Sequence, residues 1–162
     1  MFTIKIRPAE KEDLAAILKW NENKTEDDLF QWAGFTAYHY PLTLEQLSQQ
    51  AEKTDVTLFI ILEDTVPIGT AELCDIDHTA KTGRICRVLF AEEARGKGYG
   101  KAALQAISQF AFTKMDLVSL SLRVFCFNVS AIRCYEKVGF RVTEYFAEKD
   151  PKWNNFSMEY HK

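Results

Sequence analysis

A glycine-rich stretch, Arg95-Gly96-Lys97-Gly98-Tyr99-Gly100-Lys101, has the residue types needed to bind a phosphorylated ligand. It follows an apolar run over 85–90 that predicts a strand, and it precedes a helical pattern over 98–114. Small residues at such a junction let the main chain approach a ligand, and the first turn of a helix offers free N–H groups with a partial positive charge. Three mobile cations surround the same point. We therefore expect this loop to bind phosphate or pyrophosphate.

Three nucleotide-binding patterns compete for this loop. A P-loop needs glycine at position 95 and serine or threonine at position 102, and the chain has neither. A dinucleotide fingerprint can be placed on Gly98, Gly100 and Ala103, with Asp116 as the acid that would bind a ribose. A third spacing, Arg-x-x-Gly-x-Gly, fits from Arg95 onward without adjustment.

A second block of polar and small residues opens at Asn128. By itself it predicts the end of a strand, a short helix capped by Ser130, and a stop at Gly139. Together with the first loop it resembles the GCN5-related N-acetyltransferase (GNAT) family, which has an Arg/Gln-x-x-Gly-x-Gly/Ala loop followed by Asn-x₆-Tyr-x-Lys-x-Gly-Phe. The opening Ile6-Arg7-Pro8 with Asp13-Leu14 is similar to the common start of that family. The resemblance extends over about residues 4–160.

The resemblance implies an α/β fold with a mixed, mostly antiparallel central sheet, splayed at the coenzyme A cleft and flanked by helices. We expect one N-acetyltransferase domain over residues 1–162. Local patterns predict strands over 2–7, 56–63, 67–76, 85–90, 117–127, 140–146 and 156–160, and helices over 10–20, 43–53, 98–114 and 130–137. Residues 21–40 are polar at first and then unusually aromatic.

The resemblance also implies where coenzyme A binds. The main chain of Val88, Leu89 and Phe90 would pair with the pantetheine amides as an added strand. The N–H of Leu89 or its neighbour would face the thioester oxygen, where negative charge develops. Asn128 would contact the pantetheine arm, and it equally suits a turn at the end of a strand. The residues expected to bind the cofactor are Val88, Leu89, Phe90, Arg95, Gly96, Lys97, Gly98, Tyr99, Gly100, Lys101, Asn128 and Tyr135.

Two residues are candidates for proton transfer. Tyr135 faces the cleft in related enzymes, and a phenol with a pKa of about 10 can give its proton to a departing thiolate with a pKa of about 8.5. The alternative for Tyr135 is a core aromatic that anchors its helix. Many family members carry a glutamate about eleven residues before the loop, where this chain has Arg84. Glu72 on the neighbouring strand is then the candidate general base, acting through a water, and a salt-bridged role is its alternative.

We therefore expect an acetyl-CoA-dependent N-acetyltransferase that moves an acetyl group directly to a primary amine, a small molecule or a peptide N-terminus, in a ternary complex. A non-catalytic acyl-CoA-binding or sensor module is the alternative, suggested by Arg84, and a nicotinamide- or flavin-binding protein is a weaker one. Aromatic residues are candidates for the acceptor side, with a core or dimer-surface role as their alternative. They are Trp20, Phe30, Trp32, Phe35, Tyr38, Tyr40 and Trp153.

The composition agrees with this interpretation. A chain of 162 residues that is 47% hydrophobic and 27% charged is typical of one globular domain, and a net charge of −3 argues against nucleic acid as the main partner. No apolar run approaches the length of about eighteen residues that a membrane helix needs, and the N-terminus does not resemble a signal peptide, so we expect a cytoplasmic protein. A homodimer is left open. Because its four cysteines lack CxxC spacing and its three histidines are scattered, we expect reduced thiols and no metal site.

Overall fold

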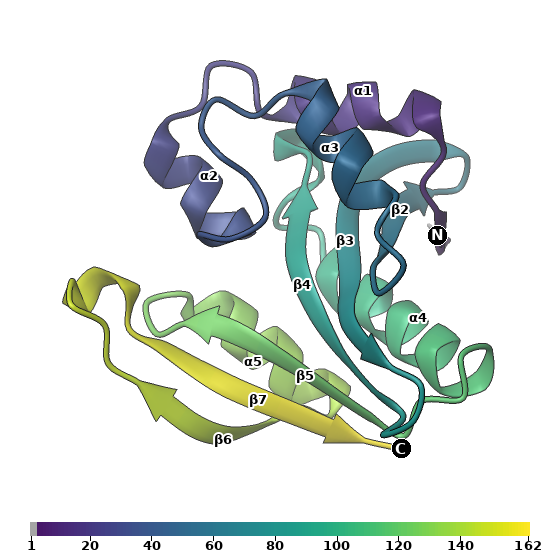
Figure 1. Cartoon of the computed structure of the whole chain (residues 1–162), viewed down its shortest axis with the longest axis vertical. Coiled ribbons are helices and arrows are strands. Elements are labelled where there is room, and N and C mark those ends of the chain that lie inside the picture. The colour runs from purple at the N-terminus through teal and green to yellow at the C-terminus, as the bar shows by residue number, and fades with distance from the viewer. Residues whose placement is uncertain (1–2) are drawn as a thin grey trace.

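The computed structural model describes residues 3–162 and contains one seven-stranded sheet in the order β1-β2-β3-β4-β5-β7-β6 (Figure 1). Its strands are β1 Ile4–Pro8, β2 Thr57–Glu63, β3 Val66–Asp77, β4 Thr82–Phe90, β5 Ser119–Phe125, β6 Arg141–Phe146 and β7 Asn155–His161. Its helices are α1 Lys11–Trp20, α2 Glu26–Ala33, α3 Leu44–Ala51, α4 Tyr99–Thr113 and α5 Val129–Val138, with the short turns η1 Glu92–Ala94 and η2 Pro151–Trp153. Every neighbouring pair of strands is antiparallel except β4 and β5. The mixed, mostly antiparallel sheet expected from the sequence is confirmed.

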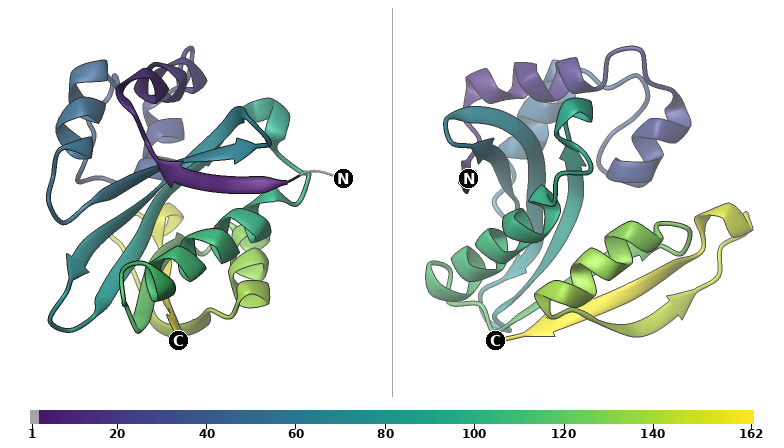
Figure 2. Two further views of the ribbon diagram at one scale, coloured as in Figure 1. Left: turned by 90° about the vertical axis from the view of Figure 1, so that its right-hand side faces the viewer. Right: turned by 180° about the vertical axis from the view of Figure 1, so that it is seen from behind.

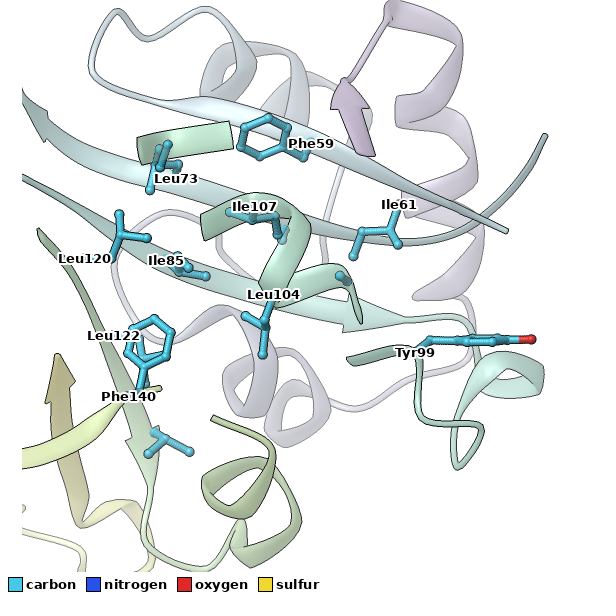
Figure 3. Packing of buried hydrophobic residues seen from close by; sticks show 14 of the residues in the cluster. Phe59, Ile61, Leu73, Ile85, Tyr99, Leu104, Ile107, Leu120, Leu122 and Phe140 are labelled. Atoms are coloured by element: carbon cyan, nitrogen blue, oxygen red, sulfur yellow. The ribbon is translucent and has the colours of Figure 1, made fainter. Parts of the chain in front are cut away.

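Helices cover both faces of the sheet because β2 is apolar on both of its faces. Phe59 and Ile61 join a cluster that contains the inner face of α4, whereas Ile60 packs with α1, α2 and α3. Figure 2 shows α4 and α5 on one side of the sheet. In Figure 3, Leu104 and Ile107 of α4 lie over the side chains of the central strands. These two clusters hold the strands that line the site.

The residues of the opening motif tie the first strand to the first helix. Arg7 donates two hydrogen bonds to Asp13, at 2.6 and 3.1 Å, and the backbone N–H of Glu10 donates to the same carboxylate at 2.7 Å. The hydrogen bonds from Arg7 lower the pKa of Asp13, which is 7% exposed. The strand expected over 2–7 begins at Ile4 in the described residues, and Phe2 lies outside them.

One helix was not predicted, and one predicted helix cap was wrong. The stretch 21–40 contains a helix, α2, whose N-terminus is a capping box: Thr25 accepts from the N–H of Asp28, and Asp28 accepts from the N–H of Thr25. The cap of α5 is Asn128, not Ser130, because the Asn128 side chain accepts from the N–H of Ala131. In both cases the polar side chain nearest the real first turn satisfies a free backbone N–H.

The expectation of four reduced thiols is also corrected. Cys74 and Cys86 are joined by a disulfide, and Cys126 and Cys134 are free. The two bonded cysteines lie on β3 and β4, which are antiparallel neighbours, so a separation of 12 residues brings them together across the hairpin. A cross-strand pair of this kind leaves no CxxC spacing in the sequence.

Strand β4 is irregular where the functional site begins. Two of its residues, Arg87 and Val88, stand against the single residue Ala71 of β3, which makes a β-bulge, and Arg87 has a φ of 54°. On its other side β4 pairs with β5 only over residues 82–85 and 119–122. The two strands then separate (Figure 1), and β4 has no strand partner on that side beyond Ile85 within residues 3–162.

Candidate functional site

A cavity of about 1400 Å³ opens where β4 and β5 separate. The two strands contribute residues 85–90 and 123–125 to its lining. Residues of α4 and α5 line it on one side of the sheet, which we call the glycine-loop end. Residues of α2 and the stretch that follows line it on the other side, which we call the acceptor end. The cavity is therefore long enough to run through the gap in the sheet.

The predicted phosphate loop lies at the glycine-loop end, between η1 and α4. Gly96 and Gly98 have φ values of 73° and 79°, a left-handed conformation that favours glycine, and a Cβ at either position would meet nothing within 4 Å. Gly98 is the N-cap of α4 and has no side chain that could cap it, and the first turn of a helix directs backbone N–H groups toward a ligand. Backbone conformation, and not lack of space, is the reason for glycine here.

Cations surround this loop on two helices. Arg95 and Lys101 line the cavity as predicted, and Arg95 donates to the carbonyl of Phe90 at 3.3 Å. Arg133 and Lys137 of α5 line it as well. Neither Arg133 nor Lys137 was among the residues predicted to bind the cofactor. Their spacing of four residues on one helix was the signal that could have found them.

Most of the predicted cofactor-binding residues meet at this cavity. Eleven of the twelve line it, and the exception is Lys97. Asn128 lines the cavity with its side-chain oxygen already used to cap α5. Tyr99 belongs to the lining too, but its residue is 5% exposed and is counted in the core cluster that contains α4. Whether each of these residues binds the cofactor stays a prediction.

Tyr135 lines the cavity from α5 beside Cys134. Its ring centre is 6.2 Å from that of Phe140, so the ring is held against the core. Burial raises the pKa of Tyr135 to about 12 and also raises the pKa of the Cys134 thiol. At neutral pH the phenol therefore carries its proton, which is the form a general acid needs.

Glu72 lies at the centre of a buried polar network. Its carboxylate accepts from Gln50 Nε2 at 2.7 Å, from the Tyr38 hydroxyl at 2.8 Å and from Arg87 at 3.1 Å. Glu72 is 1% exposed, and the Arg87 side chain is 8% exposed. Burial and the Glu72 charge together raise the pKa of Tyr38. Because three donors enclose the carboxylate and Glu72 is not part of the cavity lining, this geometry does not favour the predicted general-base role.

The acceptor end has an aromatic character. Among the seven aromatic residues predicted for it, those that line the cavity are Trp20, Trp32 and Phe35. Tyr38 belongs to the Glu72 network, and Tyr40 is exposed and donates to the carbonyl of Lys24. Phe30 and Trp153 pack against Phe35, with ring centres at 5.0 and 5.8 Å. The side chain of Arg84, at the position where many relatives have glutamate, is bound to Asp75 at 2.8 Å.

Within residues 3–162, no three His, Cys, Asp or Glu side chains stand close enough together to hold a metal ion. No helix in that range combines the length and the apolar character required to cross a membrane.

Comparisons with known proteins agree with this geometry. The profile of the "Acetyltransferase (GNAT) family" matches residues 14–140. The spermidine N(1)-acetyltransferase of Escherichia coli K12 is 27% identical over 142 residues, which cover 86% of this chain and 74% of that protein. The N-acetyltransferase YycN of Bacillus subtilis is 45% identical over 58 residues, or 36% of each chain. The structure of Vibrio cholerae spermidine N-acetyltransferase in complex with CoA and spermine has the same fold, with a TM-score of 0.82 at 19% identity over 98% of this chain and 95% of that one.

Proposed function

The chain belongs to the acetyltransferase (GNAT) family and is an acetyl-CoA-dependent N-acetyltransferase that acts on an amine; from this premise we propose how its cavity performs the reaction. The pyrophosphate of acetyl-CoA binds at the glycine loop 95–101 and the N-terminus of α4, with Arg95, Lys101, Arg133 and Lys137 balancing its charge. The observation that carries this proposal is the left-handed glycine loop at the mouth of a gap between two parallel strands.

Pantetheine runs through that gap as an added strand. Beyond Ile85 the side of β4 that faces β5 offers main-chain groups to a ligand, and an extended chain of amides is the ligand that matches them. The bulge at Arg87 and Val88 changes the direction of these groups just before Leu89. The N–H of Leu89 or its neighbour then donates to the thioester oxygen as it gains negative charge.

The transfer itself needs two proton movements. The nitrogen of the neutral amine attacks the thioester carbon, an N–C bond forms, and the C–S bond breaks as the tetrahedral intermediate collapses. Tyr135, protonated at neutral pH, gives its proton to the departing thiolate of CoA. The proton lost by the amine passes to solvent, because Glu72 is enclosed.

Glu72 acts as a positioning residue in this proposal. Its ion pair with Arg87 fixes the side chain of the bulge, and Tyr38 and Gln50 fix Glu72 in turn. Tyr38 and Gln50 are 34 and 22 residues from Glu72 in the sequence. Through Glu72 they thus hold the part of β4 that contacts the thioester. A non-catalytic acyl-CoA-binding module is not favoured, because the relatives that this chain matches are named as N-acetyltransferases.

A thermal-shift assay followed by a thiol-release assay tests the proposal. Acetyl-CoA and CoA should raise the melting temperature, and NADH and ATP should not. Release of free CoA should then depend on an added primary amine. Stabilisation by NADH alone would overturn the placement of the cofactor, and stabilisation by acetyl-CoA without amine-dependent thiol release would leave binding without transfer.

We also propose that the chain forms a homodimer through β6. This strand lies at the edge of the sheet, and Val142 and Tyr145 on it are 46% and 54% exposed. An exposed apolar edge strand pairs readily with a second copy. Light scattering should give twice the chain mass for the wild type and the single mass for Val142→Lys, and a monomeric wild type contradicts the proposal.

A further inference from the structure

The acceptor end contains a cluster of five aromatic rings that the reaction described so far does not use. We call it the aromatic cluster, and its members are Phe30, Phe35, Phe125, Phe127 and Trp153. Trp153 is at its centre, with ring centres 5.0 Å from Phe125, 5.8 Å from Phe35, 6.3 Å from Phe127 and 6.5 Å from Phe30. Three separate parts of the chain, around α2, after β5 and in η2, supply these rings.

The cluster faces the cavity and remains open. Phe35 and Phe125 line the cavity, and Phe35 and Phe127 are 52% and 48% exposed. An ion pair between Lys152 and Asp27 ties η2 to α2 and so holds the rings from the two sides together. Preformed aromatic surface beside a reaction cavity is the usual means of binding an apolar part of a ligand.

Most of the charged side chains at the acceptor end are already paired. The carboxylates that line it are those of Asp28, Asp75 and Glu148, and the cations are those of Lys24, Arg84, Arg87 and Arg123. Three of these cations form ion pairs, Lys24 with Glu92, Arg84 with Asp75 and Arg87 with the buried Glu72. The other two carboxylates are engaged as well.

Asp28 caps its own helix, and Glu148 accepts from Asn155 at 3.2 Å. The same Asn155 accepts from Arg123 at 3.0 Å, so a positive charge lies next to Glu148. After the three ion pairs, Asp28 and Glu148 remain with one cation, Arg123, so the acceptor end has one carboxylate more than it has unpaired cations. It can balance the charge of one ammonium group and not of several.

We infer that the acceptor is a primary monoamine with an aromatic ring on a short aliphatic arm. The inference rests on the proposed transfer function and names its substrate class. The ring packs against Phe35 and Phe125, and the amino group reaches the thioester in the gap between β4 and β5. This class differs from the polycationic amine in the names of the spermidine acetyltransferases to which the chain is similar.

A panel of matched amines tests the inference with the purified full-length chain. At saturating acetyl-CoA, kcat/KM should be about tenfold or more higher for phenethylamine than for butylamine, because the ring adds the buried area of an aromatic side chain. Phenethylamine should exceed spermidine by a similar factor. A preference for spermidine, or equal values for phenethylamine and butylamine, overturns the inference while leaving the transfer function intact. No transfer to any amine, with acetyl-CoA still bound, overturns both.

Single substitutions identify the binding surface. Phe35→Ala should raise KM for phenethylamine about tenfold and leave KM for butylamine and the Kd of CoA within about twofold. Because Phe35 is 52% exposed, its loss does not threaten folding. Leu44→Ala, which removes a 47% exposed apolar side chain outside the cavity lining, is the matched control and should change none of these values. An unchanged ratio of phenethylamine to butylamine activity in Phe35→Ala contradicts the inference.

Discussion

Gly98→Ala isolates the contribution of backbone conformation to cofactor binding. Gly98 has a φ of 79°, and a Cβ built there meets nothing within 4 Å, so the substitution adds strain without a steric clash. The left-handed conformation costs a non-glycine residue about 1–2 kcal/mol. In the free protein the alanine loop relaxes to negative φ, and binding must restore the left-handed form. The Kd of acetyl-CoA should therefore rise about 5- to 30-fold.

Isothermal titration with acetyl-CoA measures this change directly. The matched control is Gly34→Ala, because Gly34 also has a positive φ, 70°, and an open Cβ position, but lies at the end of α2. Gly34→Ala should strain the backbone by a similar free energy and so lower the melting temperature of the protein. It should leave the Kd of acetyl-CoA unchanged. A Kd within twofold of wild type for Gly98→Ala would refute the placement of the pyrophosphate on this loop.

Three further predictions test the catalytic and structural roles. Tyr135→Phe should lower kcat about ten- to a thousandfold and leave the affinity for acetyl-CoA within about threefold of wild type. Because the pKa of Tyr135 is raised to about 12, the phenol keeps its proton over a wide pH range, so the kcat of the wild type should not fall with rising pH below about pH 10. Glu72→Gln leaves the buried Arg87 charge unpaired and should lower the free energy of unfolding, measured in urea, by about 3–5 kcal/mol. The shape of the pH–rate profile should not change, whereas the loss of a general base would change it. Gly139→Ala places a Cβ 2.8 Å from the Tyr160 ring at a φ of 134°, and should cost about 1–3 kcal/mol of stability in the same titration, an effect that wild-type stability would contradict.

Structural features that depend only on residues adjacent in the sequence could be predicted from it. The glycine loop and α4 follow from a local run of small residues and a helical period, and α4 was expected within one residue of its observed ends. The strand order of β5, β7 and β6 had no such local signal, because β7 inserts between two strands that precede it in the chain. Helix α2 has only eight residues, and its capping box was its one strong indication.

The environment of the candidate base could not be predicted for a different reason. Glu72 belongs to a strand whose neighbours are apolar, and the sequence offers no way to tell an open face from a covered one. Its burial depends on Tyr38, in the stretch before α3, and on Gln50, which lies in α3. The Cys74–Cys86 disulfide is likewise set by the register of two strands and not by spacing along the chain. Tertiary neighbours, which no local pattern reveals, decide these cases.

The separation of β4 from β5 creates an edge strand in the interior of the protein. Unpaired strand edges on a surface are templates for aggregation, and proteins usually blunt them with charges, prolines or covering loops. Here the edge beyond Ile85 faces a cavity bounded by β5, α2 and α5. A strand of another chain would have to pass between these elements to reach the edge, whereas an extended ligand that fits the cavity can pair with it. The arrangement that makes room for a cofactor therefore also shields the strand edge that it leaves open from pairing with other chains.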